Sequence, residues 1–126
     1  MAVRLIDSAR SRVLVAAYSL KNRWIAEALI RAYRKGLEVK VVLDASQARV
    51  GWSQYWNLWL SGIEVRTLWD FWPLRYGFAV IDGGVAVDGS YGFSRAEEGY
   101  ESVVVLQGEL VRWYSEEFGR LWVDAK

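Results

Sequence analysis

Two apolar runs of strand length, separated by one amphipathic segment, constrain the fold of this chain most strongly. Residues 12–19 (RVLVAAYS) are apolar almost throughout, which is typical of a parallel strand buried on both faces. Residues 37–44 (LEVKVVLD) are predicted to form a second strand. Between them, apolar side chains recur at the spacing of one buried helix face: Ile25, Ala28, Leu29, Ala32 and Tyr33. Strand, helix and strand in this order predict a parallel βαβ unit with a right-handed crossover.

Local signals mark the ends of this helix and indicate a second crossover. Asn22 is a suitable N-cap, and Gly36 stands where a C-terminal glycine cap belongs. Residues 63–67 (IEVRT), which follow Gly62, are predicted to form the third strand. The helix before that strand is indicated by a stripe of aromatic residues, for which packing in the core or between subunits is the default interpretation: Trp52, Tyr55, Trp56 and Trp59.

The pattern changes after the third strand. Residues 78–82, a Gly-Gly pair at 83–84 and residues 85–88 predict a β-hairpin with a tight turn. Residues 102–107 (SVVVLQ) predict a further strand. An amphipathic segment over residues 110–122 predicts a closing helix, whose two tryptophans are expected in the core: Trp113 and Trp122.

No internal repeat or linker interrupts this order of elements, so we expect one domain over residues 1–126. The fold class is α/β: an α/β/α sandwich with a mixed, largely parallel central sheet and helices on its faces. A short opening helix is indicated by four apolar residues at helical spacing: Ala2, Leu5, Ile6 and Ala9.

The composition removes several kinds of chemistry. The chain contains no cysteine and no histidine, which excludes thiol catalysis, Ser-His catalysis and the usual zinc sites. We therefore expect no metal and no cofactor. The formal net charge of +1 gives no overall basic field for nucleic acid or anionic membrane.

The apolar stretches are of strand length and too short to span a bilayer, so we expect a cytoplasmic protein without membrane contact. Arginine outnumbers lysine, and the chain has one proline, one methionine and no cysteine. These features hint at a thermophilic source.

Longer segments then resemble a known family. LIDSARSRVLVAAYSL, IAEALIRAYRKGLEVKVVLDASQ, GIEVRT, FAVIDGGVAVDGSYGFSRAEE and YESVVVL are similar, in this order, to the phospholipase D-like superfamily. The closest resemblance is to its small endonuclease-type members, which carry one His-x-Lys-…-Asp motif per chain. In that family a histidine attacks phosphorus, a second histidine protonates the leaving oxygen, and lysine and asparagine hold the phosphoryl oxygens. Two motifs are needed, so single-motif chains pair as two-fold dimers.

Carried onto this sequence, the family motif is degenerate. The histidine position falls on Arg75, the lysine position on Gly77 and the asparagine position on Gly92, whereas the aspartate is kept as Asp82. A guanidinium stays protonated, so Arg75 is neither nucleophile nor proton shuttle. The resemblance therefore implies that no catalytic site is intact.

Other positions match the family without restoring its chemistry. Gly89 and Ser90 correspond to its Gly-Ser pair, and Glu101 corresponds to a glutamate that supports the family's histidine. Arg75, Ser90 and Glu101 are candidates for a residual anion site. The interpretation we prefer is that Arg75 pairs with Glu101 and fills the space of the lost catalytic pair, because a buried arginine without a partner would be costly.

The segment that leads into the motif carries exposed-type aromatic residues. Trp69 and Trp72 are candidates for stacking on bases, with Arg66, Arg75 and Arg95 as candidate phosphate ligands. The same residue types are enriched in protein interfaces, and the near-zero net charge favours that alternative.

Three functions remain open from the sequence. The first is a non-catalytic homodimer, paired through the vestigial active-site face, that binds nucleic acid or another phosphate-bearing ligand. The second is a structural or regulatory subunit, with an intact member of the family as a candidate partner. The third is a residual phosphodiesterase or endonuclease, for which the sequence offers no nucleophile.

Overall fold

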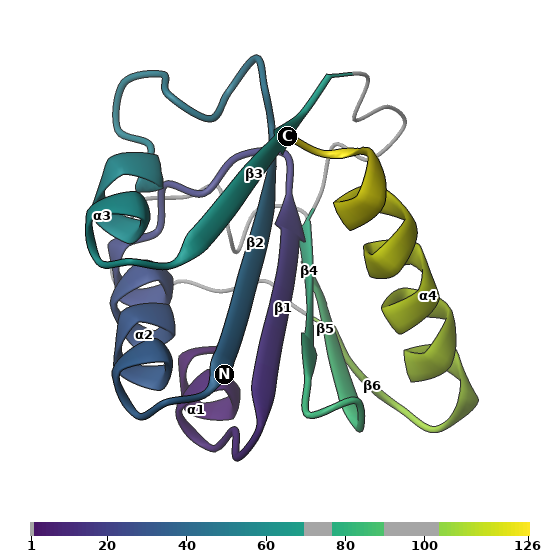
Figure 1. Ribbon diagram of the computed structural model, residues 1–126. Helices are drawn as coiled ribbons and strands as arrows, with labels where there is room; N and C mark the ends of the chain where they lie inside the picture. Colours follow the sequence, from purple (N-terminus) through teal and green to yellow (C-terminus); the bar gives the residue numbers. More distant parts are fainter. Residues whose placement is uncertain (1, 70–76, 90–103) are drawn as a thin grey trace.

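The computed structural model describes residues 2–69, 77–89 and 104–126 of the chain (Figure 1). In chain order, the described elements are α1 (Ala2–Asp7), β1 (Arg12–Ala17), α2 (Arg23–Arg34), β2 (Glu38–Asp44), α3 (Tyr55–Leu60), β3 (Glu64–Leu68), β4 (Gly77–Ile81), β5 (Val85–Gly89), β6 (Val104–Gln107) and α4 (Glu109–Asp124). The strands form one sheet in the order β3-β2-β1-β4-β5-β6.

Helices cover both faces of this sheet. Helices α1, α2 and α3 lie on one face, and α4 lies on the other (Figure 1). Strand β1 shows why its sequence is apolar throughout: Val13 and Val15 belong to the core under α1–α3, whereas Leu14 and Ala16 belong to the core under α4. The predicted α/β sandwich with a mixed sheet is confirmed.

The parallel part of the sheet is smaller than predicted. Strands β1, β2 and β3 pair in parallel, as the two crossovers require. The three remaining pairings among the described strands, β1 with β4, β4 with β5 and β5 with β6, are antiparallel. The term "largely parallel" was therefore wrong, because the hairpin is inserted beside β1 and β6 extends it in the antiparallel sense.

Helix α2 begins and ends at the residues that the sequence indicated. The side chain of Asn22 accepts a hydrogen bond from the backbone N–H of Ile25 at 3.1 Å, as an N-cap does. Gly36, with φ of +91°, follows the last turn in the left-handed conformation that glycine adopts without strain. The apolar face between these caps is buried except for Tyr33, which is 37% exposed, and the helix packs on α1 and β2.

No helix in the part of the chain that the structure describes is long and apolar enough to cross a membrane.

Candidate functional site

One end of the sheet gathers the ends of most strands. Ala17, Asp44, Leu68 and Gly89 are the last residues of β1, β2, β3 and β5, and Gly77 is the first residue of β4. We call this the carboxyl end of the sheet, and the opposite end, which includes Asp82, the amino end. In open α/β sheets ligands bind outside the carboxyl ends of the parallel strands, so the carboxyl end is the candidate functional site.

Two positions of the family motif meet at the carboxyl end. Gly77, at the motif's lysine position, pairs directly with Gly89 across β4 and β5. Gly77 also pairs with Ala17 of β1 on its other side. Trp69 follows β3 at the same end. The remaining candidate site residues lie outside the described part of the chain: Trp72, Arg75, Ser90, Gly92, Arg95 and Glu101.

Asp82 is separated from these positions by the whole of β4. Five residue steps of about 3.4 Å place it about 17 Å from Gly77, at the amino end of the sheet. Its carboxylate accepts hydrogen bonds from the backbone N–H groups of Arg10, Ser11 and Arg12 at 2.8–3.1 Å, and from the hydroxyl of Ser11 at 3.0 Å. Asp82 thus fastens the loop between α1 and β1 to the β4–β5 turn.

The electrostatics of Asp82 reflect this role. Burial by itself would raise the pKa of the Asp82 carboxyl, but the hydrogen bonds from Ser11, Arg12 and Arg10 stabilise the charged form more strongly. The pKa consequently falls to about 2. Asp82 has φ of +57° and Gly83 has φ of +73°, the left-handed backbone that tight hairpin turns need. The kept aspartate is therefore a structural residue of the turn.

The two aspartates within the described strands, Asp44 and Asp88, also have local partners. Asp44 accepts hydrogen bonds from the backbone N–H of Ser46 at 2.9 Å and from the hydroxyl of Ser46. Asp88 accepts a hydrogen bond from the hydroxyl of Tyr114 on α4. Within residues 2–69, 77–89 and 104–126, no group of three acidic side chains is placed to hold a metal ion.

The aromatic stripe before β3 differs from its prediction. Helix α3 begins only at Tyr55, so Trp52 precedes it and is 80% exposed. Trp56 and Trp59 are half exposed, while the residues that α3 buries are Tyr55 and Leu58. The three tryptophans therefore do not pack in the core of the chain, because helical spacing does not distinguish a buried tryptophan from an exposed one; packing between subunits stays a prediction.

The two tryptophans expected in the core, Trp113 and Trp122, differ in how far they are buried. Trp113 is half exposed, so its assignment to the core was wrong. Trp122 is partly buried and stacks on Phe118 with ring centroids 5.8 Å apart. The guanidinium of Arg66 lies over the Trp122 ring at 3.9 Å and donates to the Trp122 carbonyl at 2.9 Å. Arg66, a candidate phosphate ligand from the sequence, is thus held on the α4 face and paired with Glu64 at 2.9 Å.

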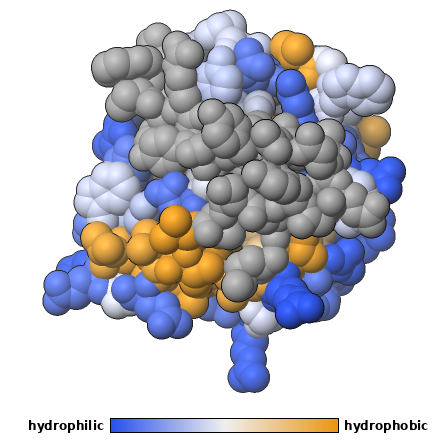
Figure 2. Space-filling model, turned by 180° about the vertical axis from the view of Figure 1, so that it is seen from behind, coloured by the Kyte–Doolittle hydropathy of each residue, from blue (hydrophilic) through white to orange (hydrophobic). Residues whose placement is uncertain are grey.

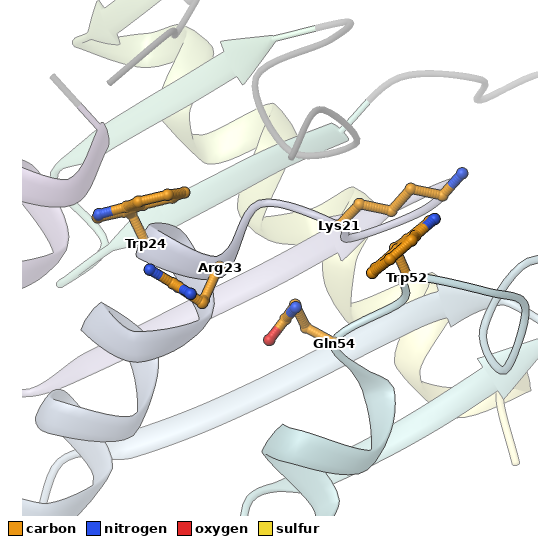
Figure 3. A pocket seen from close by; sticks show the side chains of 5 residues that line it. All are labelled: Lys21, Arg23, Trp24, Trp52 and Gln54. Carbon is orange, nitrogen blue, oxygen red and sulfur yellow. The ribbon is translucent and has the colours of Figure 1, made fainter. Parts of the chain in front are cut away.

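A pocket that the sequence analysis did not identify lies beside the carboxyl end (Figure 3). It is formed by the loop before α2 and the loop before α3, and its lining residues are Lys21, Arg23, Trp24, Trp52 and Gln54. Trp24 in the first turn of α2 was the available signal, but its partners lie about 30 residues away in the sequence. Trp69, 71% exposed, is a further aromatic side chain at this end.

The fold agrees with comparisons to known proteins. Residues 2–122 match the family described as "Cardiolipin synthase, PLD-like domain". The chain therefore belongs to the phospholipase D-like family.

Individual relatives support this assignment. The mitochondrial cardiolipin hydrolase of Mus musculus is 27% identical over 125 residues, which cover 97% of this chain and 57% of that protein. The phospholipase D of Rickettsia bellii is 32% identical over 106 residues, 81% of this chain and 52% of that protein. The chain spans about half the length of the curated relatives that it matches.

A solved structure has the same fold over almost the whole chain. Nuc, a phospholipase D family member from Salmonella typhimurium, superposes with a TM-score of 0.85 and 26% identity, covering 99% of this chain and 86% of that one. The resemblance to small endonuclease-type members is thus reflected in the backbone as well as in the motif spacing.

Proposed function

We propose that this chain is a catalytically degenerate phospholipase D-like domain that binds nucleic acid or another phosphate-bearing ligand at the carboxyl end of the sheet. The observation that carries the proposal is the pairing of Gly77 with Gly89. It brings the two motif strands together at the end where the family's ligands are expected, while glycine occupies the motif's lysine position.

The loss of catalysis follows from the residue types available. The chain has no histidine, so the family's nucleophile and general acid are both absent from it. Arg75 at the nucleophile position keeps a positive charge and two parallel N–H donors for a phosphate. Relatives named for hydrolysis of cardiolipin and for phospholipase D activity act on phosphate-bearing molecules, which supports a phosphate-bearing ligand here.

The exposed tryptophans at this end favour nucleic acid among such ligands. Trp69 and Trp52 present most of their indole surface to solvent, and bases stack on such surfaces. A two-fold dimer through the same face, as in single-motif members of the family, would double this surface.

The test combines a cleavage assay with a binding assay. The protein is incubated with single-stranded and double-stranded DNA in EDTA, and cleavage is followed on gels; we expect none. Binding of fluorescein-labelled oligonucleotides is then measured by anisotropy across a salt series, where affinity should fall steeply with salt. Arg75→Ala should weaken binding, whereas the matched control Arg112→Ala, on an arginine whose side chain is 84% exposed on α4, should not.

Two results would overturn the proposal. Metal-independent cleavage that Arg75→Ala abolishes would make the chain an enzyme. Absence of oligonucleotide binding at low salt, together with absence of binding to vesicles containing anionic phospholipid, would remove the phosphate-bearing ligand.

A second candidate function has its own observation. An apolar patch lies on the back of the molecule (Figure 2), on the side of the outer strand β6 and the start of α4. On β6 and the first turns of α4, Val104 and Leu110 are about 60% exposed, and Trp113 is half exposed. Exposed apolar patches mark contact surfaces, so a structural or regulatory subunit is the alternative, with an intact family member as the candidate partner. This alternative would be supported if Leu110→Glu dissociates a protein complex, measured by sedimentation, and leaves oligonucleotide binding unchanged.

A further inference from the structure

The pocket before α2 and α3 has an unusual lining for a surface depression of its size. Two cations, Lys21 and Arg23, and two indoles, Trp24 and Trp52, surround it together with the amide of Gln54. None of these five lining residues is acidic, and the space measures about 180 Å³. This is smaller than the roughly 300–1,000 Å³ of pockets that enclose a drug-sized ligand, so it suits part of a nucleotide, such as a single base.

The two loops that form the pocket are fastened to each other. The backbone N–H of Gln54 donates to the carbonyl of Leu20 at 2.8 Å, which links the loop before α3 to the loop before α2. Ser53 donates through its hydroxyl to the carbonyl of Ala48 and accepts from the N–H of Tyr55 at 3.2 Å. These bonds fix the backbone next to Lys21 and Trp52 before any ligand arrives, so the loops themselves need little ordering on binding.

The aromatic and cationic groups of the pocket remain available for a ligand. Trp52 is 80% exposed, and in Figure 3 the Lys21 side chain extends alongside its ring. The guanidinium of Arg23 lies over Trp24 at 4.6 Å. Its ion pair with Glu27 spans 3.7 Å between two largely exposed side chains, which makes it weak and easily exchanged for a phosphate.

We propose that this pocket binds one nucleotide of a single-stranded nucleic acid, with an unpaired base stacked on Trp52 and its phosphate held by Lys21 and Arg23. The inference rests on the proposed function and adds the class of ligand. A base in a duplex has both faces covered by its neighbours, so stacking on a side chain selects unpaired bases. Gln54 lines the same pocket; its amide oxygen accepts a hydrogen bond from Asn57 at 3.0 Å, and its amide N–H groups are candidate donors to the edge of such a base.

The position of the pocket connects it to the motif strands. Lys21 follows β1 by four residues, and the last residue of β1, Ala17, pairs with Gly77. A single-stranded nucleic acid that crosses the carboxyl end of the sheet from Gly89 past Gly77 toward α2 therefore runs in the direction of the pocket. The pocket uses no residue of the family motif.

The experiment compares a fluorescein-labelled oligothymidine with a duplex of equal length by anisotropy. Trp52→Ala should weaken binding of the single strand at least about fivefold, the low end of a lost base–aromatic stack, and leave the duplex unchanged. The matched control is Trp59→Ala, since Trp59 is another exposed tryptophan, at 51%, but lies on α3 outside the pocket. Lys21→Gln combined with Arg23→Gln should reduce the salt slope of single-strand binding by about 0.7, the value for one neutralised phosphate of a single strand.

The outcomes separate this inference from the proposed function. If the wild-type protein binds oligonucleotides and Trp52→Ala behaves like Trp59→Ala, the pocket is not the site and the inference fails alone. If the wild-type protein binds the duplex as tightly as the single strand, selection for unpaired bases is contradicted. If no oligonucleotide binds at low salt, the nucleic-acid function and this inference fail together. Thermal melting by circular dichroism verifies that each variant is folded, as expected for substitutions of exposed side chains.

Discussion

The two ends of the sheet use their polar and aromatic residues in opposite ways. At the amino end, the carboxylate of Asp82 is saturated by donors from residues 10–12 and tightens a turn. At the carboxyl end, Trp52 and Trp69 present indole rings to solvent. The aspartate that the motif keeps thus stabilises the fold, whereas the exposed indoles at the other end belong to residues outside the motif.

Of the changes that distinguish the two ends of the sheet, Asp82→Ala is expected to have the largest effect on stability. The change removes the acceptor of four donors and places alanine at φ of +57°, where a Cβ is strained. We expect the free energy of unfolding to fall by about 2–3 kcal/mol, measured with urea. The folded fraction should still bind oligonucleotides like the wild type. A loss of affinity at unchanged stability would show that the amino end takes part in binding.

Lowering the pH should remove the contribution of the Asp82 charge to the free energy of unfolding, which is somewhat smaller than the effect of Asp82→Ala. The pKa of Asp82 is about 2 in the folded state and near its ordinary 3.8 in the unfolded state. Its contribution is therefore present above about pH 4 and is lost as the pH falls toward 2. The pKa shift corresponds to a little over 2 kcal/mol, and solvent exposure reduces this to about 1–2 kcal/mol.

The control for this pH dependence is Asp82→Asn, which tolerates the positive φ but carries no charge. Urea unfolding of both proteins at pH 5, 4, 3 and 2 isolates the Asp82 contribution from that of other carboxylates. The stability difference between wild type and variant should shrink steadily as the pH decreases. A difference that stays constant with pH would contradict the charge-based account of the turn.

Local signals in the sequence predicted much of the fold. Asn22 and Gly36 lie at the ends of α2 because capping depends on residues within one helical turn. The continuous apolar run of β1 predicted that both faces of this strand are covered, and its residues do alternate between the two cores. The hairpin signal over residues 78–88 predicted a mixed sheet, but no local signal predicted how many of its pairings are antiparallel.

The parts of the site that escaped prediction depend on contacts between distant residues. Arg66 meets Trp122 across 56 positions, and Asp82 meets Ser11 across 71. The pocket likewise joins Lys21 to Trp52 through loops whose relative position no local rule specifies. Aromatic spacing placed Trp52 in a helical stripe, although α3 begins three residues later.

Asn22 is a structural residue at the carboxyl end of the sheet. Substituting it shows how much that end contributes to stability. Asn22→Ala removes the N-cap of α2 from a side chain that is only 2% exposed. We expect a loss of about 1–2 kcal/mol in the free energy of unfolding, measured with urea. Asn22→Ser keeps an acceptor at the cap and should recover most of the loss. An equal loss in both variants would mean that capping is not what Asn22 contributes.

The smallest effect on stability is expected from Trp69→Ala, and it decides whether the comparison holds. Trp69 is 71% exposed, so its removal should change the free energy of unfolding by less than about 0.5 kcal/mol. If the carboxyl end is a binding surface, the same change should weaken oligonucleotide binding or, by sedimentation, dimerisation, whereas Trp59→Ala should affect neither. A stability loss above about 1 kcal/mol would instead assign Trp69 to packing. The carboxyl end would then be as structural as the amino end, and the contrast between them would rest on Trp52 and its pocket alone.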